Sequence, residues 1–141
     1  LGCTPLFAVA AQPGRPANWL DLLAAGVTLT AVVVETLADE QLRRFLDSNP
    51  PEGKIMSEGL WGYSRHPNYF GELLFWWGLY LFALAADPSW WWTGVGAVSI
   101  TLLFVFVSLP LIEERSRERR PDWQAHAARV SRLVPWPPDE E

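Results

Sequence analysis

Cysteine is almost absent from this sequence, since Cys3 is the single one among 141 residues. An internal disulfide and a metal site built from several cysteines are therefore excluded. Positive charge is also scarce, because 11 Lys and Arg stand against 16 Asp and Glu, for a formal net charge of −5. No basic stripe alternates with exposed aromatic residues, so we expect no nucleic-acid partner.

The start of the chain lacks both an initial methionine and a basic segment ahead of the apolar run 1–11. That run is too short and has the wrong flank for a secretory signal peptide. We therefore interpret the chain as a fragment or a processed chain.

Three apolar blocks are present, and we expect each to be a membrane helix. They cover residues 19–38, 69–86 and 90–112, and the third carries no charge over 23 residues. A helix of about 20 residues crosses the hydrocarbon core of a bilayer. The first two blocks are short for a full span, but the tryptophan pairs and triplets at 76–77 and 90–92 are typical of an aromatic belt. The sequence thus predicts an all-α polytopic membrane bundle.

The positions of Lys and Arg predict the orientation of this bundle. Ten of the 11 lie in the loop 39–68 or the tail 113–141, and Arg15 alone falls on the other side. The positive-inside rule makes that loop and tail cytoplasmic, in an inner membrane. The loop should begin as a helix and end at the turn 49–53. The tail should form a polar helix from Glu113 to about Val130, interrupted at Pro121, and then an extended segment.

Acidic residues lie near the cytoplasmic end of the first block, where burying a carboxylate in lipid costs free energy, so their presence calls for an explanation. Glu35, Asp39 and Arg43 are spaced by four residues and share one helix face. One interpretation is a self-paired helix end that reaches for water. The other is a polar stripe that lines a cavity open to the cytoplasm.

The segment "SRHPNYFGE", residues 64–72, places a basic pair directly before the second block. Pro67 suits the first position of a helix, and a start capped by Asn68 is the alternative. In either case free backbone N–H groups lie beside Arg65 and His66, which outlines an anion site. Gly71 leaves room for a ligand or for another helix. A plain interfacial cap without a ligand remains the competing interpretation.

Glu113 and Glu114 follow the longest apolar block, where they are either solvated or part of a site. His126 lies on the polar tail helix and is predicted to be at the surface. Three separate segments thus place polar groups at one membrane depth. We expect Glu35, Asn68 and Glu72 to meet in a single water-accessible hollow.

These motifs resemble a known family. "SRHPNYFGE" preceded by "GLWGY", with "ETLADEQL" at 35–42 and "RRPDWQAHAARVSRLVPWPP" at 119–138, is similar to bacterial membrane proteins of the steroid 5-alpha-reductase C-terminal domain type. The match covers roughly residues 30–138. The wider clan includes sterol reductases and isoprenylcysteine carboxyl methyltransferases. The resemblance implies that residues 1–141 are the C-terminal part of one such domain.

The resemblance also implies a cofactor site. Reductases of the clan bind NADPH in a cavity that faces the cytoplasm. Carried over by motif, the cofactor-binding residues are Glu35, Asp39, Arg43, Tyr63, Arg65, His66, Asn68, Tyr69, Glu72, Glu113 and Glu114. One departure is that Glu113 or Glu114 falls near a position that is histidine in the steroid reductases. The substrate-polarising residues of those enzymes lie in an N-terminal half, so no catalytic residue is assigned here.

The implied reaction is hydride transfer from NADPH to the activated C=C bond of an apolar, lipid-like substrate that enters from the bilayer. An S-adenosylmethionine-dependent methyltransferase is the alternative, supported by the "RHP" pattern and the pair Glu113-Glu114. A non-catalytic membrane scaffold is the third possibility. Because NADPH is anionic and S-adenosylmethionine is cationic, the basic residues of the loop favour the reductase.

Overall fold

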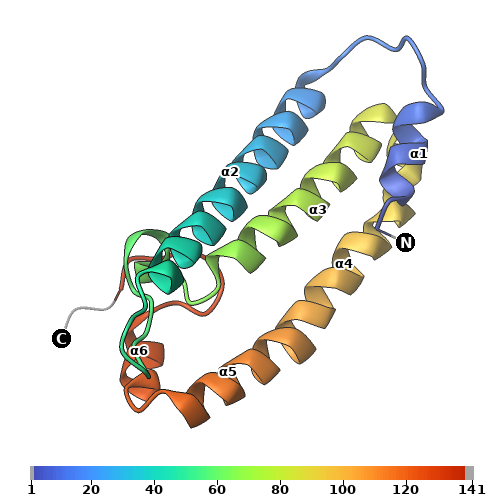
Figure 1. The fold of residues 1–141 in the computed structure, drawn as a ribbon. Helices are drawn as coiled ribbons and strands as arrows, with labels where there is room; N and C mark the ends of the chain where they lie inside the picture. Colours follow the sequence, from blue (N-terminus) through green and yellow to red (C-terminus); the bar gives the residue numbers. More distant parts are fainter. Residues whose placement is uncertain (1, 139–141) are drawn as a thin grey trace.

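The computed structural model describes residues 2–138 and is all-helical in that range (Figure 1). Its helices are α1 (Thr4–Ala10), α2 (Trp19–Asp47), α3 (Pro67–Ala86), α4 (Gly94–Leu103), α5 (Leu109–Arg119) and α6 (Trp123–Arg129). Short 3-10 turns occupy Gly59–Gly62 and Pro88–Thr93, and a π-helical turn, Phe104–Ser108, joins α4 to α5. The predicted all-α class is confirmed.

Three helical stretches are long and apolar enough to cross a membrane, namely Trp19–Asp47, Pro67–Ala86 and Pro88–Arg119. They correspond to the three predicted blocks, and they indicate an integral membrane protein. α2 runs on through Asp47, as predicted for the helical start of the loop, and the third stretch runs on through Arg119, as predicted for a polar helix that includes Glu113. The polar extensions continue the same helices because nothing before Ser48 or Arg120 breaks them.

Small residues hold α2 and α3 together, side by side and antiparallel (Figure 1). Ala24, Ala31 and Ala38 recur every seven residues on α2, and all three are fully buried. On α3 the same spacing places Gly71 and Gly78 against α2. Small side chains allow two backbones to approach closely, which is the main source of helix association in lipid. Of the two roles considered for Gly71, room for another helix is therefore confirmed.

The ends of these helices follow the expected chemistry. Asn18 caps α2 through a capping box with Asp21. α3 begins at Pro67, as predicted, with His66 outside the helix. The alternative start at Asn68 is wrong, because Asn68 already has helical geometry and its side chain bonds Asp39 instead of capping the helix.

The third stretch is irregular at its middle. The π-helical turn Phe104–Ser108 comes just before Pro110, which has no N–H to donate to the carbonyl of Phe106. Insertion of a wider turn lets the helix pass a proline within the bilayer.

Figure 1 shows α6 and the C-terminal segment gathered where α2 finishes and α3 begins. We call this end of the bundle, which also contains α5, the charged end. The predicted interruption at Pro121 is confirmed, as α5 ends at Arg119 and α6 begins at Trp123.

Candidate functional site

One carboxylate, that of Glu113 on α5, joins three parts of the charged end. Its Oε1 lies 3.2 Å from the guanidinium of Arg65 and 3.2 Å from Nε2 of His66. Its Oε2 lies 3.2 Å from Nε of Arg132 in the C-terminal segment. Glu113 therefore connects the segment before α3 to α5 and to the tail, and it is shielded from solvent with Arg65 and His66.

The C-terminal segment 131–136, here called the tail strap, runs along the residues that precede α3. The N–H of Arg65 donates to the carbonyl of Ser131 at 2.8 Å, and the Ser64 hydroxyl donates to the carbonyl of Leu133 at 2.8 Å. Further along, the N–H of Trp136 donates to the carbonyl of Tyr63 at 2.9 Å. Because Ser64 is fully buried under this strap, the segment "YSRH" is fixed from both sides.

A cavity of about 220 Å³, here called the basic cavity, lies between the end of α2, the start of α3, α5 and α6. Among the residues that the structure describes, its lining contains no Asp or Glu and four basic side chains, those of Arg65, His66, Arg120 and His126. Aromatic and apolar side chains supply most of the rest, and Trp123 has the guanidinium carbons of Arg65 and Arg120 each 5.9 Å from its ring centre. The cavity thus combines positive charge with aromatic surface.

Burial governs the titration of these bases. It lowers the pKa of His66, against the opposing effect of the Glu113 carboxylate. Burial also lowers the pKa of His126, and the nearby guanidinium groups of Arg65, Arg129 and Arg120 add to this. Both histidines are therefore neutral at pH 7. The pKa values of Arg65 and Arg120 are lowered first by burial as well, but a guanidinium stays charged at physiological pH.

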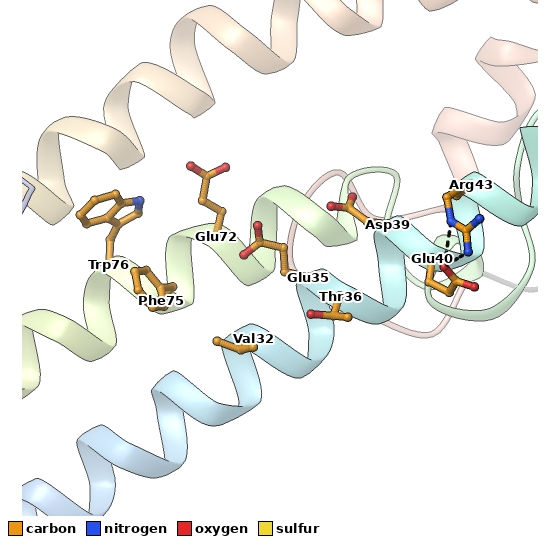
Figure 2. A pocket seen from close by; sticks show the side chains of 9 residues that line it. All are labelled: Val32, Glu35, Thr36, Asp39, Glu40, Arg43, Glu72, Phe75 and Trp76. Carbon is orange, nitrogen blue, oxygen red and sulfur yellow. Dashed lines mark hydrogen bonds and ion pairs between the residues drawn. The ribbon is translucent and has the colours of Figure 1, made fainter.

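A second, larger hollow of about 720 Å³ lies along α2 and α3 and is here called the acidic hollow. Figure 2 shows Glu35, Asp39 and Glu72 with their carboxylates on the same side of the helix pair, and Trp76 beside Glu72. Glu40 and Arg43 also line it, joined by an ion pair of 2.6 Å. The two acids of adjacent helices, Glu35 and Glu72, thus share one hollow, as predicted.

Asn68 stands between the two spaces. Its side-chain nitrogen donates to Asp39 of the acidic hollow at 3.1 Å, while Asn68 itself lines the basic cavity. The single hollow predicted for Glu35, Asn68 and Glu72 is therefore two spaces linked by this hydrogen bond. Two buried polar atoms next to the basic cavity, Oδ1 of Asn68 and Nε of Arg65, have no hydrogen-bond partner. Such atoms are rare in folded proteins, and they are an acceptor and a donor that a ligand can satisfy.

The remaining predicted residues divide between these places. Tyr69 lines the basic cavity and its ring meets those of His66 and Phe104 edge-on. Glu114 is exposed on α5, and the Tyr63 side chain is 49% exposed and lines neither space. The predicted roles of all eleven residues in cofactor binding stay predictions.

The expectation that His126 is at the surface is wrong. His126 is only 8% exposed, packs against Trp123 and lines the basic cavity. Trp123 and His126 form the buried face of α6, and Val130, four residues after His126, is buried at the C-terminal cap of the helix. That spacing was the available signal, and it was outweighed by the many polar residues around it. Arg120 and Arg132 carried no signal of their own, since their positions depend on how the tail folds back.

Comparison with known proteins gives two matches. Residues 1–130 match the model of a family described as "Protein of unknown function (DUF1295)". A protein of Schizosaccharomyces pombe (strain 972 / ATCC 24843), "Uncharacterized protein C594.04c", is 28% identical over 134 residues, which cover 82% of this chain and 39% of that protein. The chain thus spans about two fifths of the length of this relative. No solved structure shows a significant match to this chain.

Proposed function

This chain belongs to the DUF1295 family of membrane proteins, and we propose that it forms the cofactor-binding part of an NADPH-dependent membrane reductase. The family belongs to a clan that includes reductases and methyltransferases. The observation that supports a reductase is the lining of the basic cavity, which has four bases and no Asp or Glu among the described residues. Such a lining favours an anionic ligand over a cationic one.

The residues present fit an anionic dinucleotide. The unpartnered Nε of Arg65 and the guanidinium of Arg120 are suited to phosphate oxygens, which accept from guanidinium groups in strong hydrogen bonds. The unpartnered Oδ1 of Asn68 is suited to an N–H donor, as the carboxamide of nicotinamide offers. The carboxylates of the acidic hollow are suited to hydroxyl and amide donors. The basic cavity holds one end of such a ligand, because 220 Å³ is below the 300–1,000 Å³ typical of whole-ligand sites.

When bound, NADPH supplies a hydride to the electron-poor carbon of an activated C=C bond. The chain orients the ligand through the fixed segment "YSRH" and the Asn68–Asp39 hydrogen bond. The apolar substrate of steroid or lipid type approaches from the bilayer along Val32 and Phe75.

The second candidate is an S-adenosylmethionine-dependent methyltransferase, and the acidic hollow favours it. A sulfonium cation is stabilised by carboxylates and by an aromatic face such as that of Trp76. Against this, Glu113, the acid shared with that class, is already bonded to Arg65, His66 and Arg132. We therefore rank the reductase first.

The test measures binding of NADPH and of S-adenosylmethionine to the full protein in neutral detergent by isothermal titration calorimetry. The variant is Arg120→Gln, which removes a charge from the basic cavity, and its matched control is Arg119→Gln, an exposed neighbour outside that cavity. Loss of a charged hydrogen bond costs about 1.5–3 kcal/mol, so NADPH binding weakens by roughly 10- to 100-fold in the variant alone.

Saturable binding of S-adenosylmethionine without any NADPH binding would replace the reductase by the methyltransferase. Binding of neither ligand, with Asn68→Ala and Glu72→Gln as stable as the unaltered protein, would leave a membrane scaffold. Equal weakening of NADPH binding in Arg120→Gln and Arg119→Gln would show a general effect of surface charge. The lining of the basic cavity would then no longer support the reductase proposal.

A further inference from the structure

The basic cavity has an apolar side that the binding of phosphate does not use. Besides its bases, its lining contains Leu42, Phe45 and Leu46 of α2, together with Ile55 and Met56 of the loop that follows. We propose that this cavity also binds an amphipathic anion, that is, an alkyl chain with a carboxylate or a phosphate at one end. The anion competes with NADPH for the cavity, and that competition alone rests on the function proposed above.

The basic groups of the cavity are gathered around one ring, that of Trp123. The guanidinium carbons of Arg65 and Arg120 each lie 5.9 Å from the centre of this ring, and the centre of the His126 ring lies 5.8 Å from it. These side chains come from the segment before α3, from the residue that follows α5, and from α6. Together they form the charged side of the cavity.

The apolar side comes from another element. Leu42, Phe45 and Leu46 are spaced by three and four residues, so they share one face of α2. Leu46 is 57% exposed and Phe45 is partly exposed, so this face has apolar surface that a ligand can cover. An alkyl chain that lies there gains free energy roughly in proportion to the apolar area removed from water.

The charged side has hydrogen-bond donors that are available to an anion. Nη1 of Arg65 lies 3.2 Å from Glu113, but Nε of Arg65 is buried without a hydrogen-bond partner. Arg120 forms no ion pair with an acid in residues 2–138. Carboxylate and phosphate oxygens accept strong, charge-assisted hydrogen bonds from guanidinium groups.

The two sides of the cavity also differ in their position relative to the membrane. The four bases lie outside the candidate spans, whereas Leu42, Phe45, Leu46, Tyr69 and Ile112 lie inside them. A molecule with an anionic head and an apolar chain matches this division. The volume of 220 Å³, that of about seven water molecules, admits the head and the first methylene groups of such a chain.

The experiment follows the thermal unfolding midpoint of the full protein in neutral detergent, because a ligand that binds the folded state raises that midpoint. The probes are soluble in water: hexyl phosphate and hexanoate carry the two candidate heads, methyl phosphate lacks the long chain, and hexyltrimethylammonium has the opposite charge. Arg120→Gln is the variant for the head, and Arg119→Gln, an exposed neighbour outside the cavity, is its control. Leu46→Gln is the variant for the chain, and Val134→Gln, also 57% exposed and outside the cavity, is its control.

We expect hexyl phosphate and hexanoate to raise the midpoint and hexyltrimethylammonium to leave it unchanged. Each buried methylene contributes about fourfold in affinity, so hexyl phosphate should bind at least about tenfold more tightly than methyl phosphate. Arg120→Gln should weaken binding about tenfold, Leu46→Gln by a smaller factor, and neither control should change it. If Arg120→Gln does not fold, Ser116→Glu places a repelling carboxylate in the same lining and should abolish the response.

The two anionic heads distinguish the source of the ligand. A response to hexyl phosphate alone identifies a phosphorylated amphiphile, and a response to hexanoate alone identifies a fatty acid. Hexyl phosphate should also raise the apparent Kd of NADPH measured by calorimetry. An absence of NADPH binding would count against the reductase and would leave the response to hexyl phosphate in place, so the two proposals fail separately.

Four outcomes would overturn the amphiphile site. The first is a midpoint that responds to neither anion, or equally to hexyltrimethylammonium. The second is equal affinity for hexyl and methyl phosphate, because the apolar side then holds no chain. The third is an equal loss of affinity in Arg120→Gln and Arg119→Gln, because the binding is then due to diffuse surface charge. The fourth is NADPH that binds and is not displaced by hexyl phosphate, because the amphiphile then lies elsewhere.

Discussion

The packing of α2 against α3 can be tested at a single position, Gly71, where the backbone of α2 lies directly against α3. A Cβ atom added there would lie 2.7 Å from the backbone nitrogen of Glu35 and 3.0 Å from the carbonyl oxygen of Ala31. Ordinary van der Waals contact begins near 3.4 Å. Because the obstacles are backbone atoms, Gly71→Ala forces the helices apart and disturbs the place where Glu35 and Glu72 share the acidic hollow.

The magnitude follows from two opposing effects. Overpacking a closely packed site costs about 1–3 kcal/mol. Alanine is favoured over glycine within a helix by about 1 kcal/mol. Gly26 on α2 provides the matched control, since a Cβ there meets nothing within 4 Å. Gly26→Ala carries the gain in helix propensity alone, so the difference in unfolding free energy between the two variants isolates the overpacking and should be about 1–3 kcal/mol.

The assay is equilibrium unfolding of the full protein in mixed micelles by a denaturing detergent, followed through tryptophan fluorescence. Gly71→Ala should unfold at a lower fraction of denaturing detergent than the unaltered protein or be near it, and Gly26→Ala at a higher one. Equal stabilisation by both substitutions would refute the close approach of α2 and α3 at Gly71, and with it the geometry of the acidic hollow.

Three further predictions concern the charged end. Glu113→Gln should lower the free energy of unfolding by about 2–3 kcal/mol. This is less than the roughly 3–5 kcal/mol typical of fully buried ion pairs, because one of the two arginine partners of Glu113 is partly exposed. Glu114→Gln, at an exposed position, should change the free energy of unfolding little. Burial lowers the pKa values of His66 and His126, so below about pH 6.5 the unfolded chain binds more protons than the folded chain. The free energy of unfolding should therefore be highest above that pH and fall as the pH drops, by at most about 1.4 kcal/mol per pH unit for each histidine. The slope should be smaller in His126→Gln. An unchanged slope in that variant would contradict the burial of its ring. Asn68→Ala should cost about 1 kcal/mol of stability, as measured by the same unfolding assay, but weaken NADPH binding tenfold or more.

The sequence was sufficient where a local pattern determines the structure. Uninterrupted apolar residues predicted the three spans, and the fixed φ of Pro67 predicted the first residue of α3. The shared face of Glu35 and Asp39 follows from helical periodicity alone, and both residues line the acidic hollow. These features need no knowledge of which segments meet.

The sequence was insufficient where distant segments meet. The bonds of Glu113 to His66 and Arg132 join α5 to residues 47 positions earlier and 19 positions later in the chain. The bond to Arg132 depends on the tail strap, which folds back along Tyr63 through backbone hydrogen bonds that any sequence can form. The bond to His66 depends on how α5 packs against the segment before α3. His126 is buried because α6 packs against distant parts of the chain around the basic cavity.

The distribution of polar groups between the two ends of the bundle is itself an argument for function. At the far end a local ion pair, Arg15–Asp21, closes the start of α2. At the charged end, acidic groups of α2 and α3 line the acidic hollow, and basic groups from the segment before α3, from α6 and from the residue that follows α5 line the basic cavity. Membrane insertion does not require buried bases such as His66 and His126. Solvated charges at a helix end would be equally compatible with the bilayer and would avoid the free-energy cost of desolvation. A chain that retains them, with the Arg65 Nε and the Asn68 Oδ1 left unpartnered beside them, has an arrangement better explained by a bound anion than by the membrane alone.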